Sequence, residues 1–231
     1  MVQTLIDGKS LEDVKVYTSK MPNLPSAQRD VVTTDVQGRV HGALTRKYGW
    51  KDATISIPLT YYDFNNLQQI KRELTPIIQN GKQLSFSNDN KYYLLLKQAD
   101  LSEVSPGEIE VVGELTIEAT VDPFQYLITK TETHTETFDL DNPSSMEASP
   151  LITIHGSGHV ELVINSETIG INNVVDQVTI DSRLFTCYSS TTNFDNKMTG
   201  DYPTLKSGQN TIQFGTGVTS VEIDPRWCWL L

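Results

Sequence analysis

The stretch that decides the fold reads Val178-Thr179-Ile180-Asp181-Ser182, then Thr211-Ile212-Gln213-Phe214, then Val221-Glu222-Ile223-Asp224-Pro225-Arg226. Apolar and polar residues alternate in each segment, which is the period of a strand with one buried face. Turns are predicted between the segments at Gly200-Asp201-Tyr202-Pro203 and Lys206-Ser207-Gly208-Gln209-Asn210, because Gly, Pro, Asn and Asp favour turn conformations. Three strands with long connections predict one side of a β-sandwich.

The residues before this stretch continue the same pattern. Leu151-Ile152-Thr153-Ile154 predicts a strand that turns at Gly156-Ser157-Gly158 and returns along Val160-Glu161-Leu162-Val163-Ile164. Another strand is expected near Glu167-Thr168-Ile169-Gly170-Ile171. Strands spaced about 8–12 residues apart, with turn residues between them, are typical of an all-β sandwich. We therefore predict a C-terminal β-sandwich domain over residues 131–231.

The N-terminal half is also rich in strands. Residues 83–97 predict a hairpin around a polar turn, and residues 110–120 alternate over the length of a long strand. Asp122-Pro123-Phe124 ends this set of strands, and the polar stretch Thr129–Thr137 follows it. We therefore place a first domain at residues 1–130.

One substantial helix is expected in this first domain. Leu67, Ile70 and Leu74 recur at the spacing of one helical face, so a helix is predicted over residues 65–74. Pro76 should break it, because proline lacks the N–H that an interior helical position needs. A short second helical turn is then expected at 76–79. The predicted class is all-β with one or two short helices.

Composition and charge exclude several classes of function. The 231 residues carry a formal net charge of −11, which opposes binding to nucleic acid, since phosphates need Lys and Arg. It also opposes binding to anionic membranes, and no apolar run approaches the roughly 20 residues that span a bilayer. No signal peptide is visible, which predicts folding in a reducing cytoplasm. Cys187 and Cys228 are then expected as buried thiols and not as a disulfide.

Two pairs of residues are candidates for a metal site or a catalytic site. His155 and His159 bracket a Gly-Ser-Gly turn, but no third ligand has an obvious place beside them, so a solvated hairpin tip is the favoured interpretation. Asp122 and Asp181 could form the carboxylate pair of a glycoside hydrolase. Asp181 follows a strand and precedes a polar loop, so capping of that turn is favoured. We predict no catalytic, cofactor-binding or metal-binding residues, no cofactor, and no enzymatic activity.

Aromatic residues offer a further possibility, a sugar-binding groove. Aromatic residues in β proteins more often belong to cores or interfaces, which is the favoured interpretation here. The apolar tail Trp227–Leu231 is expected to pack against the body or a neighbouring subunit. A carbohydrate-binding module and a β-sandwich glycoside hydrolase remain as alternative functions. The aromatic residues in question are Trp50, Trp227, Trp229, Tyr61, Tyr62, Tyr92 and Tyr93.

The order of these segments resembles the distal tail proteins, the baseplate hub family of siphophages that infect Gram-positive bacteria. The first half ends with the matching run Val121-Asp122-Pro123-Phe124-Gln125-Tyr126, and the second opens with Ser149-Pro150-Leu151-Ile152-Thr153-Ile154-His155-Gly156-Ser157-Gly158. Val178–Ser182, Asp201-Tyr202-Pro203-Thr204-Leu205 with Gly208 and Asn210, and Ile223-Asp224-Pro225-Arg226 follow in the family's order. The resemblance covers nearly the whole chain.

The resemblance implies a structural virion protein. Residues 1–130 would be a β-sandwich with a helix that assembles into a hexameric ring, and residues 131–231 a galectin-like β-sandwich outside the ring. The implied partners are other copies of the chain, the tail tube protein and the tail-tip protein, with no nucleic acid and no membrane. The implied location is the phage tail tip, assembled in the bacterial cytoplasm. The chain has no room for an inserted carbohydrate-binding module, which some members carry.

Overall fold

A computed structural model describes residues 2–62, 67–102, 105–106 and 113–231. The chain divides into two compact units, the first comprising Met1–Tyr126 with Leu230–Leu231 and the second Leu127–Trp229. Each unit has its own cluster of buried apolar side chains. Strands make up most of the regular structure in both units, so the predicted all-β class is confirmed. No helix among the described residues is long and apolar enough to cross a membrane.

The first unit is built on one large sheet. Its strands run in the order β2-β1-β7-β8-β10-β6-β3, with β9 and β22 pairing with β10 as well, so the sheet has nine strands. Short 3-10 turns lie at Leu11–Val14 and Ser87–Asp89. The strand bounds are β1 Thr4–Ile6, β2 Lys9–Ser10, β3 Val16–Thr18, β6 Ala53–Tyr61, β7 Gln83–Phe86, β8 Tyr92–Leu101, β9 Ser105–Pro106, β10 Gly113–Leu127 and β22 Cys228–Leu230.

This sheet curls until its two ends meet. Thr4 on β1 donates its backbone N–H to the hydroxyl of Thr18 on β3 at 3.1 Å, and the two hydroxyls are 2.8 Å apart. Both threonines are almost fully buried. The curled sheet therefore encloses its own apolar core, where the resemblance predicted two separate layers. Ile55, Ile57 and Ile117 are among the core side chains, each at most 1% exposed.

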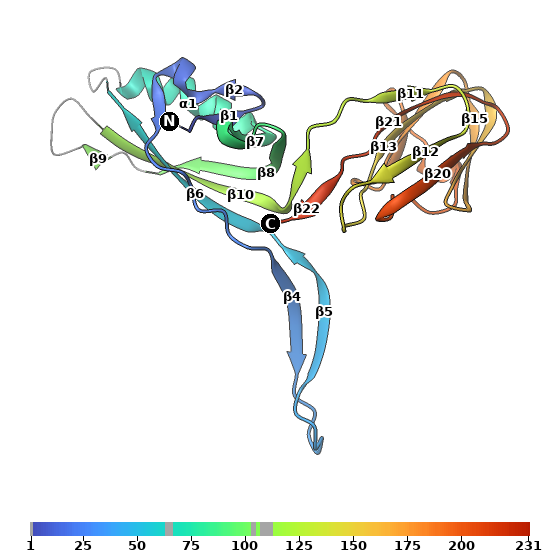
Figure 1. Cartoon of the computed structure of the whole chain (residues 1–231), viewed down its shortest axis with the longest axis horizontal. Helices are drawn as coiled ribbons and strands as arrows, with labels where there is room; N and C mark the ends of the chain where they lie inside the picture. Colours follow the sequence, from blue (N-terminus) through green and yellow to red (C-terminus); the bar gives the residue numbers. More distant parts are fainter. Residues whose placement is uncertain (1, 63–66, 103–104, 107–112) are drawn as a thin grey trace. The chain divides into compact units, whose positions relative to one another are not determined.

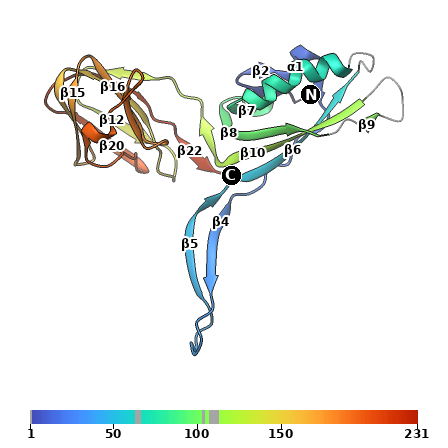
Figure 2. The same ribbon diagram turned by 180° about the vertical axis from the view of Figure 1, so that it is seen from behind.

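Helix α1 (Leu67–Asn80) covers this core (Figures 1 and 2). It buries Ile70, Leu74 and Ile78, which recur every four residues and join the core cluster. The predicted break at Pro76 is wrong, because the helix continues through it. Pro76 and Arg72 lie on the exposed face, where water can bond the Arg72 carbonyl that lacks its N–H donor. Residues 65 and 66, where the helix was predicted to begin, lie outside the described residues.

The second unit is a sandwich of two sheets, as predicted. A six-stranded sheet has the order β11-β21-β13-β16-β17-β18, and a five-stranded sheet has the order β12-β20-β14-β15-β19. A 3-10 turn lies at Asp195–Lys197. The strand bounds are β11 Glu132–His134, β12 Phe138–Asn142, β13 Leu151–Gly156, β14 Gly158–Ile164, β15 Glu167–Val174, β16 Gln177–Asp181, β17 Thr186–Ser189, β18 Thr192–Asn193, β19 Met198–Thr199, β20 Gly208–Phe214 and β21 Val218–Asp224.

Two details of the predicted pairing are wrong. The stretch 178–226 does not form one side of the sandwich, because β16 and β21 flank β13 in one sheet while β20 lies in the other. The predicted hairpin of β13 and β14 is instead a corner, because these two strands belong to different sheets. Gly158 has a φ of +77° at this corner, a conformation that glycine adopts without a steric penalty.

Both cysteines are free and buried, which confirms the expectation of two thiols. Burial, with a smaller contribution from the charge of Asp195, raises the pKa of Cys187 to about 12. A thiol with this pKa stays protonated at neutral pH and is a poor nucleophile.

We expect a fragment of residues 127–229 to fold alone. The buried core of the second unit draws only on residues in this range, so removing the first unit takes nothing from it. The fragment should give a β-type circular dichroism spectrum, melt cooperatively and sediment as a monomer. An unfolded fragment would contradict the proposed domain division, whereas a fragment that forms hexamers would contradict the assignment of ring formation to the first domain.

Candidate interaction surface

Asp181 has a structural role in the second unit. Its carboxylate accepts two hydrogen bonds from the Arg226 guanidinium, at 2.7 and 3.2 Å, and two from the backbone N–H groups of Arg183 and Leu184. Burial alone would raise the pKa of Asp181, but Arg226 and the two N–H donors outweigh it and leave the pKa below its usual value. The carboxylate therefore caps the turn after β16, as the sequence predicted, and ties that turn to the end of β21.

The other candidate carboxylate, Asp122, belongs to the first unit. It lies on β10, where its Oδ2 is 3.9 Å from the Nζ of Lys97. Asp122 and Asp181 thus belong to different units, and each contacts a basic residue of its own unit.

The two candidate histidines lie on different sheets. His155 on β13 contacts Glu222 at 3.1 Å, and His159 on β14 contacts Glu161 at 3.1 Å and Asn172 at 2.8 Å. The oxygens of Glu161 and Asn172 accept hydrogen bonds from the protonated ring and so raise the pKa of His159. Among the described residues, no group of three or more His, Cys, Asp and Glu side chains is arranged to hold a metal ion.

The candidate aromatic residues are divided between the two units, and two of them, Tyr92 and Tyr93, line a pocket of about 100 Å³ in the first unit. Tyr61 is buried in the first core and Trp227 in the second, while Trp229 packs against the second core. Tyr93 stacks on Tyr126 at 5.5 Å between ring centroids. The tail also packs against the body, as expected, since Leu231 contacts the core of the first unit.

Among the described residues of the first unit, those of the β4–β5 hairpin (residues 28–51) do not belong to the core cluster. Strand β4 (Gln28–Thr34) pairs with β5 (Leu44–Lys51) in a separate two-stranded sheet, which extends away from the curled sheet in Figure 1. All but two of the strand residues are exposed, and Val40 at the tip is 91% exposed. A two-stranded hairpin is at best marginally stable alone in water, so this one is expected to need a partner surface.

One face of the hairpin combines apolar and basic side chains. Val32 pairs with Arg46 and Thr34 pairs with Leu44, and residues paired directly across two strands lie on the same face. Tyr48 lies on this face as well, because every second residue of a strand points to the same side. Val32 is 47% exposed, Leu44 41% and Tyr48 51%. Exposed apolar side chains gathered in this way mark an interaction surface.

The root of the hairpin is held by contacts between its own strands. The Arg29 guanidinium lies 4.4 Å from the centroid of the Trp50 ring and donates to the Tyr48 carbonyl at 3.3 Å. Lys51 pairs with Asp30 at 3.6 Å. These contacts keep the two strands in register where they leave the sheet.

The hairpin also differs from the rest of the chain in charge. It contains five basic and two acidic residues, a net charge of +3, whereas the remainder of the chain carries −14. A basic and apolar hairpin on an acidic protein is electrostatically complementary to another copy of the same protein. Strand β5 was not predicted from the sequence, although Leu44, Arg46, Tyr48 and Trp50 recur at the period of a strand.

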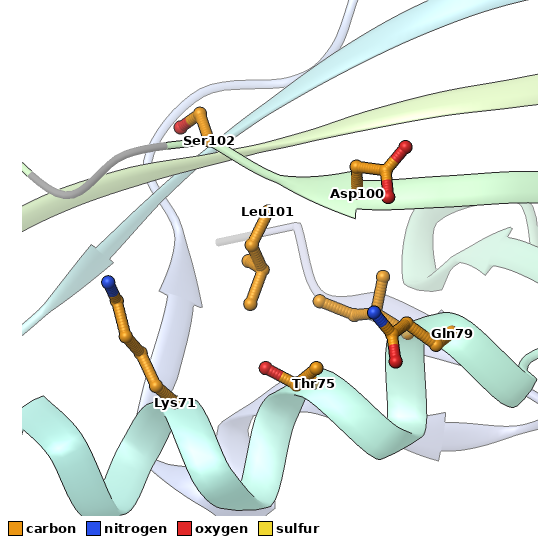
Figure 3. A pocket seen from close by; sticks show the side chains of 7 residues that line it. Lys71, Thr75, Gln79, Asp100, Leu101 and Ser102 are labelled. Carbon is orange, nitrogen blue, oxygen red and sulfur yellow. The ribbon is translucent and has the colours of Figure 1, made fainter.

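A polar pocket of about 240 Å³ lies between α1 and the end of β8 (Figure 3). Lys71, Thr75 and Gln79 line it from the helix, and Asp100 and Ser102 line it from the opposite side. The described lining combines one basic and one acidic side chain, Lys71 and Asp100, with neutral polar groups.

The fold is that of known phage tail proteins. No protein-family model matches the chain, and no curated protein matches it. The chain is similar to the Dit protein of phage SPP1, described as a paradigm of the hub adsorption apparatus in phages that infect Gram-positive bacteria. The TM-score is 0.70 at 12% identity, over 100% of both chains. It is also similar to a chain of the phage P2 baseplate in its calcium-activated conformation, with a TM-score of 0.54, 13% identity, and 96% and 97% coverage.

Proposed function

We propose that the chain is a structural subunit of a phage tail tip, the hub of a siphophage baseplate. The observation that carries this proposal is the match of its whole length to the SPP1 Dit fold, with both units included. The resemblance found in the sequence depends on the order of short motifs. The structural match, at 12% identity, depends on backbone geometry, so it supports the same family independently.

We further propose that six copies form a ring and that the β4–β5 hairpin makes contact between neighbours. The hairpin leaves Val32, Leu44 and Tyr48 exposed in the monomer, and a neighbouring copy would cover them. Its charge of +3 fits the acidic remainder of a second copy. A surface on one copy that is complementary to a different surface on the next copy produces closed rings when the rotation closes.

In this arrangement the ring joins the tail tube protein to the tail-tip protein, and the second unit is carried on its outside. The proposed location is the virion, with assembly in the host cytoplasm. A role as a carbohydrate-binding module or a glycoside hydrolase has less support. Two of the candidate aromatics, Tyr61 and Trp227, are buried in separate cores, and Asp181 is paired with Arg226.

The expected native mass is that of a hexamer, about six times 25.8 kDa. Because assembly follows mass action, monomer should appear on dilution. Native mass spectrometry and sedimentation velocity over a concentration series will measure both species. A strict monomer at every concentration, even with tail tube and tail-tip proteins present, would contradict the hub function.

A further inference from the structure

The β4–β5 hairpin is connected to the curled sheet at two points: residues 19–27 lead from β3 into β4, and β5 leads into β6 through a single residue, Asp52. Its carboxylate forms an ion pair and a hydrogen bond with Lys97 on β8. The Nζ of Lys97 also lies 3.9 Å from Oδ2 of Asp122 on β10. Strands β8, β10 and β6 are neighbours in that order, so the three charged groups form a row across the sheet at the hairpin root.

Two of these charges oppose each other. The ladder of β6 and β10 ends at Ala53 opposite Val121, so Asp52 and Asp122 are the next residues in register. Like charges directly opposite on neighbouring strands destabilise the pairing. Lys97 is the cation that both carboxylates share, and the Asp122 side chain is only 16% exposed. Without Lys97, the repulsion would favour movement of Asp52, the more exposed of the two, away from the sheet.

We propose that Lys97 is a positioning residue that fixes the direction in which the β4–β5 hairpin leaves the sheet. It does so by neutralising the Asp52–Asp122 pair at the root. The hairpin is thereby held in one orientation before it meets a second copy, which lowers the conformational cost of assembly. The consequence for ring formation rests on the proposed hub function, whereas the effect on the hairpin itself does not.

The direct test measures the hairpin in the monomer. Spin labels on Val40→Cys at the tip and Gln69→Cys on α1 report the distance between hairpin and body. Cys187 and Cys228 are at most 5% exposed and should stay unlabelled. We expect a narrow distance distribution in the otherwise native chain and a broad or shifted one in Lys97→Met. The control is Lys91→Met, at an exposed lysine just before β8, which should leave the distribution unchanged.

Two further measurements separate repulsion from a general loss of structure. Adding Asp52→Asn to Lys97→Met removes one of the opposed carboxylates and should narrow the distribution again. In about 1 M salt, where the Debye length falls to about 3 Å, the repulsion left in Lys97→Met is screened, so its distribution should narrow, whereas a general loss of structure would persist. Lys97→Gln also removes the charge and takes the place of Lys97→Met if that variant fails to fold.

The second readout is assembly. We expect the concentration at half assembly to rise about tenfold in Lys97→Met, the change that ~1.4 kcal/mol produces, and to recover in part with Asp52→Asn. A distance distribution in folded Lys97→Met or Lys97→Gln that matches the native one would overturn the positioning role, even if the ring forms. If the native chain never forms a ring but Lys97→Met still broadens the distance distribution, the hub function is contradicted and the positioning role stands.

Discussion

Replacing Asp181 by alanine should lower the free energy of unfolding of the second unit by about 3–5 kcal/mol, the usual cost of breaking a buried ion pair. The substitution leaves the Arg226 guanidinium buried without its main counter-ion, at 13% side-chain exposure. It also removes the acceptor of the Arg183 and Leu184 N–H groups. Urea unfolding followed by tryptophan fluorescence will measure the loss, since Trp227 belongs to the core of this unit.

The matched control removes both charges. Because the penalty comes mainly from a buried cation that has lost its main partner, the double variant Asp181→Ala with Arg226→Met should be less destabilised than the sum of the two single variants. The core of the first unit should unfold as in the native chain. Additive effects in the double variant would show that the two side chains stabilise the unit independently, against the geometry described here.

The same pair sets the response of the second unit to acid. The pKa of Asp181 is lower in the folded state than in the unfolded chain, where aspartate titrates near about 3.9. Its contribution to stability is therefore fully present above that value and is lost as the pH falls through the lower, folded pKa. Asp181→Ala should flatten this part of the pH dependence.

Sequence alternation predicted the buried faces of the second unit well. Val178, Ile180, Ile212, Val221 and Ile223 are all 0% exposed. A period of two identifies which side chains are buried, but it does not say which sheet a strand joins. That choice depends on the path of the chain at corners such as Gly156–Gly158, which is why β13 and β14 were wrongly paired.

Predictions from local sequence patterns failed where long-range packing, or the lack of a core beside a strand, determined the structure. Pro76 lies within a helix because the stripe of Ile70, Leu74 and Ile78 buries more apolar surface than a break would allow. Strand β5 was missed because its alternating residues face solvent in the isolated chain, so no core explains them. The candidate interaction surface on the hairpin was therefore the part of the protein hardest to predict from the sequence. The order of the motifs in the whole sequence nevertheless pointed to the right fold.

Two charges placed on the exposed face of the hairpin should abolish the ring. Val32→Asp together with Tyr48→Asp removes two apolar contacts and reduces the charge of the hairpin from +3 to +1, where it would meet an acidic neighbour. Burying an unpaired carboxylate in each contact adds a desolvation cost of several kcal/mol per ion. Six such contacts close the proposed ring, so we expect monomer at every accessible concentration.

The control makes the same change on the second unit. Leu184→Asp with Phe185→Asp alters an equally apolar pair that is 66% and 70% exposed, and the proposed ring does not use it. Sedimentation velocity should then find hexamer in this control and monomer in the hairpin variant. At a concentration below that of assembly, the hairpin variant should keep the melting temperature of the native monomer, because neither Val32 nor Tyr48 belongs to a core cluster. If the hairpin variant still forms hexamers, the contact between neighbours lies elsewhere on the first unit; if the control loses them, the second unit takes part in the ring.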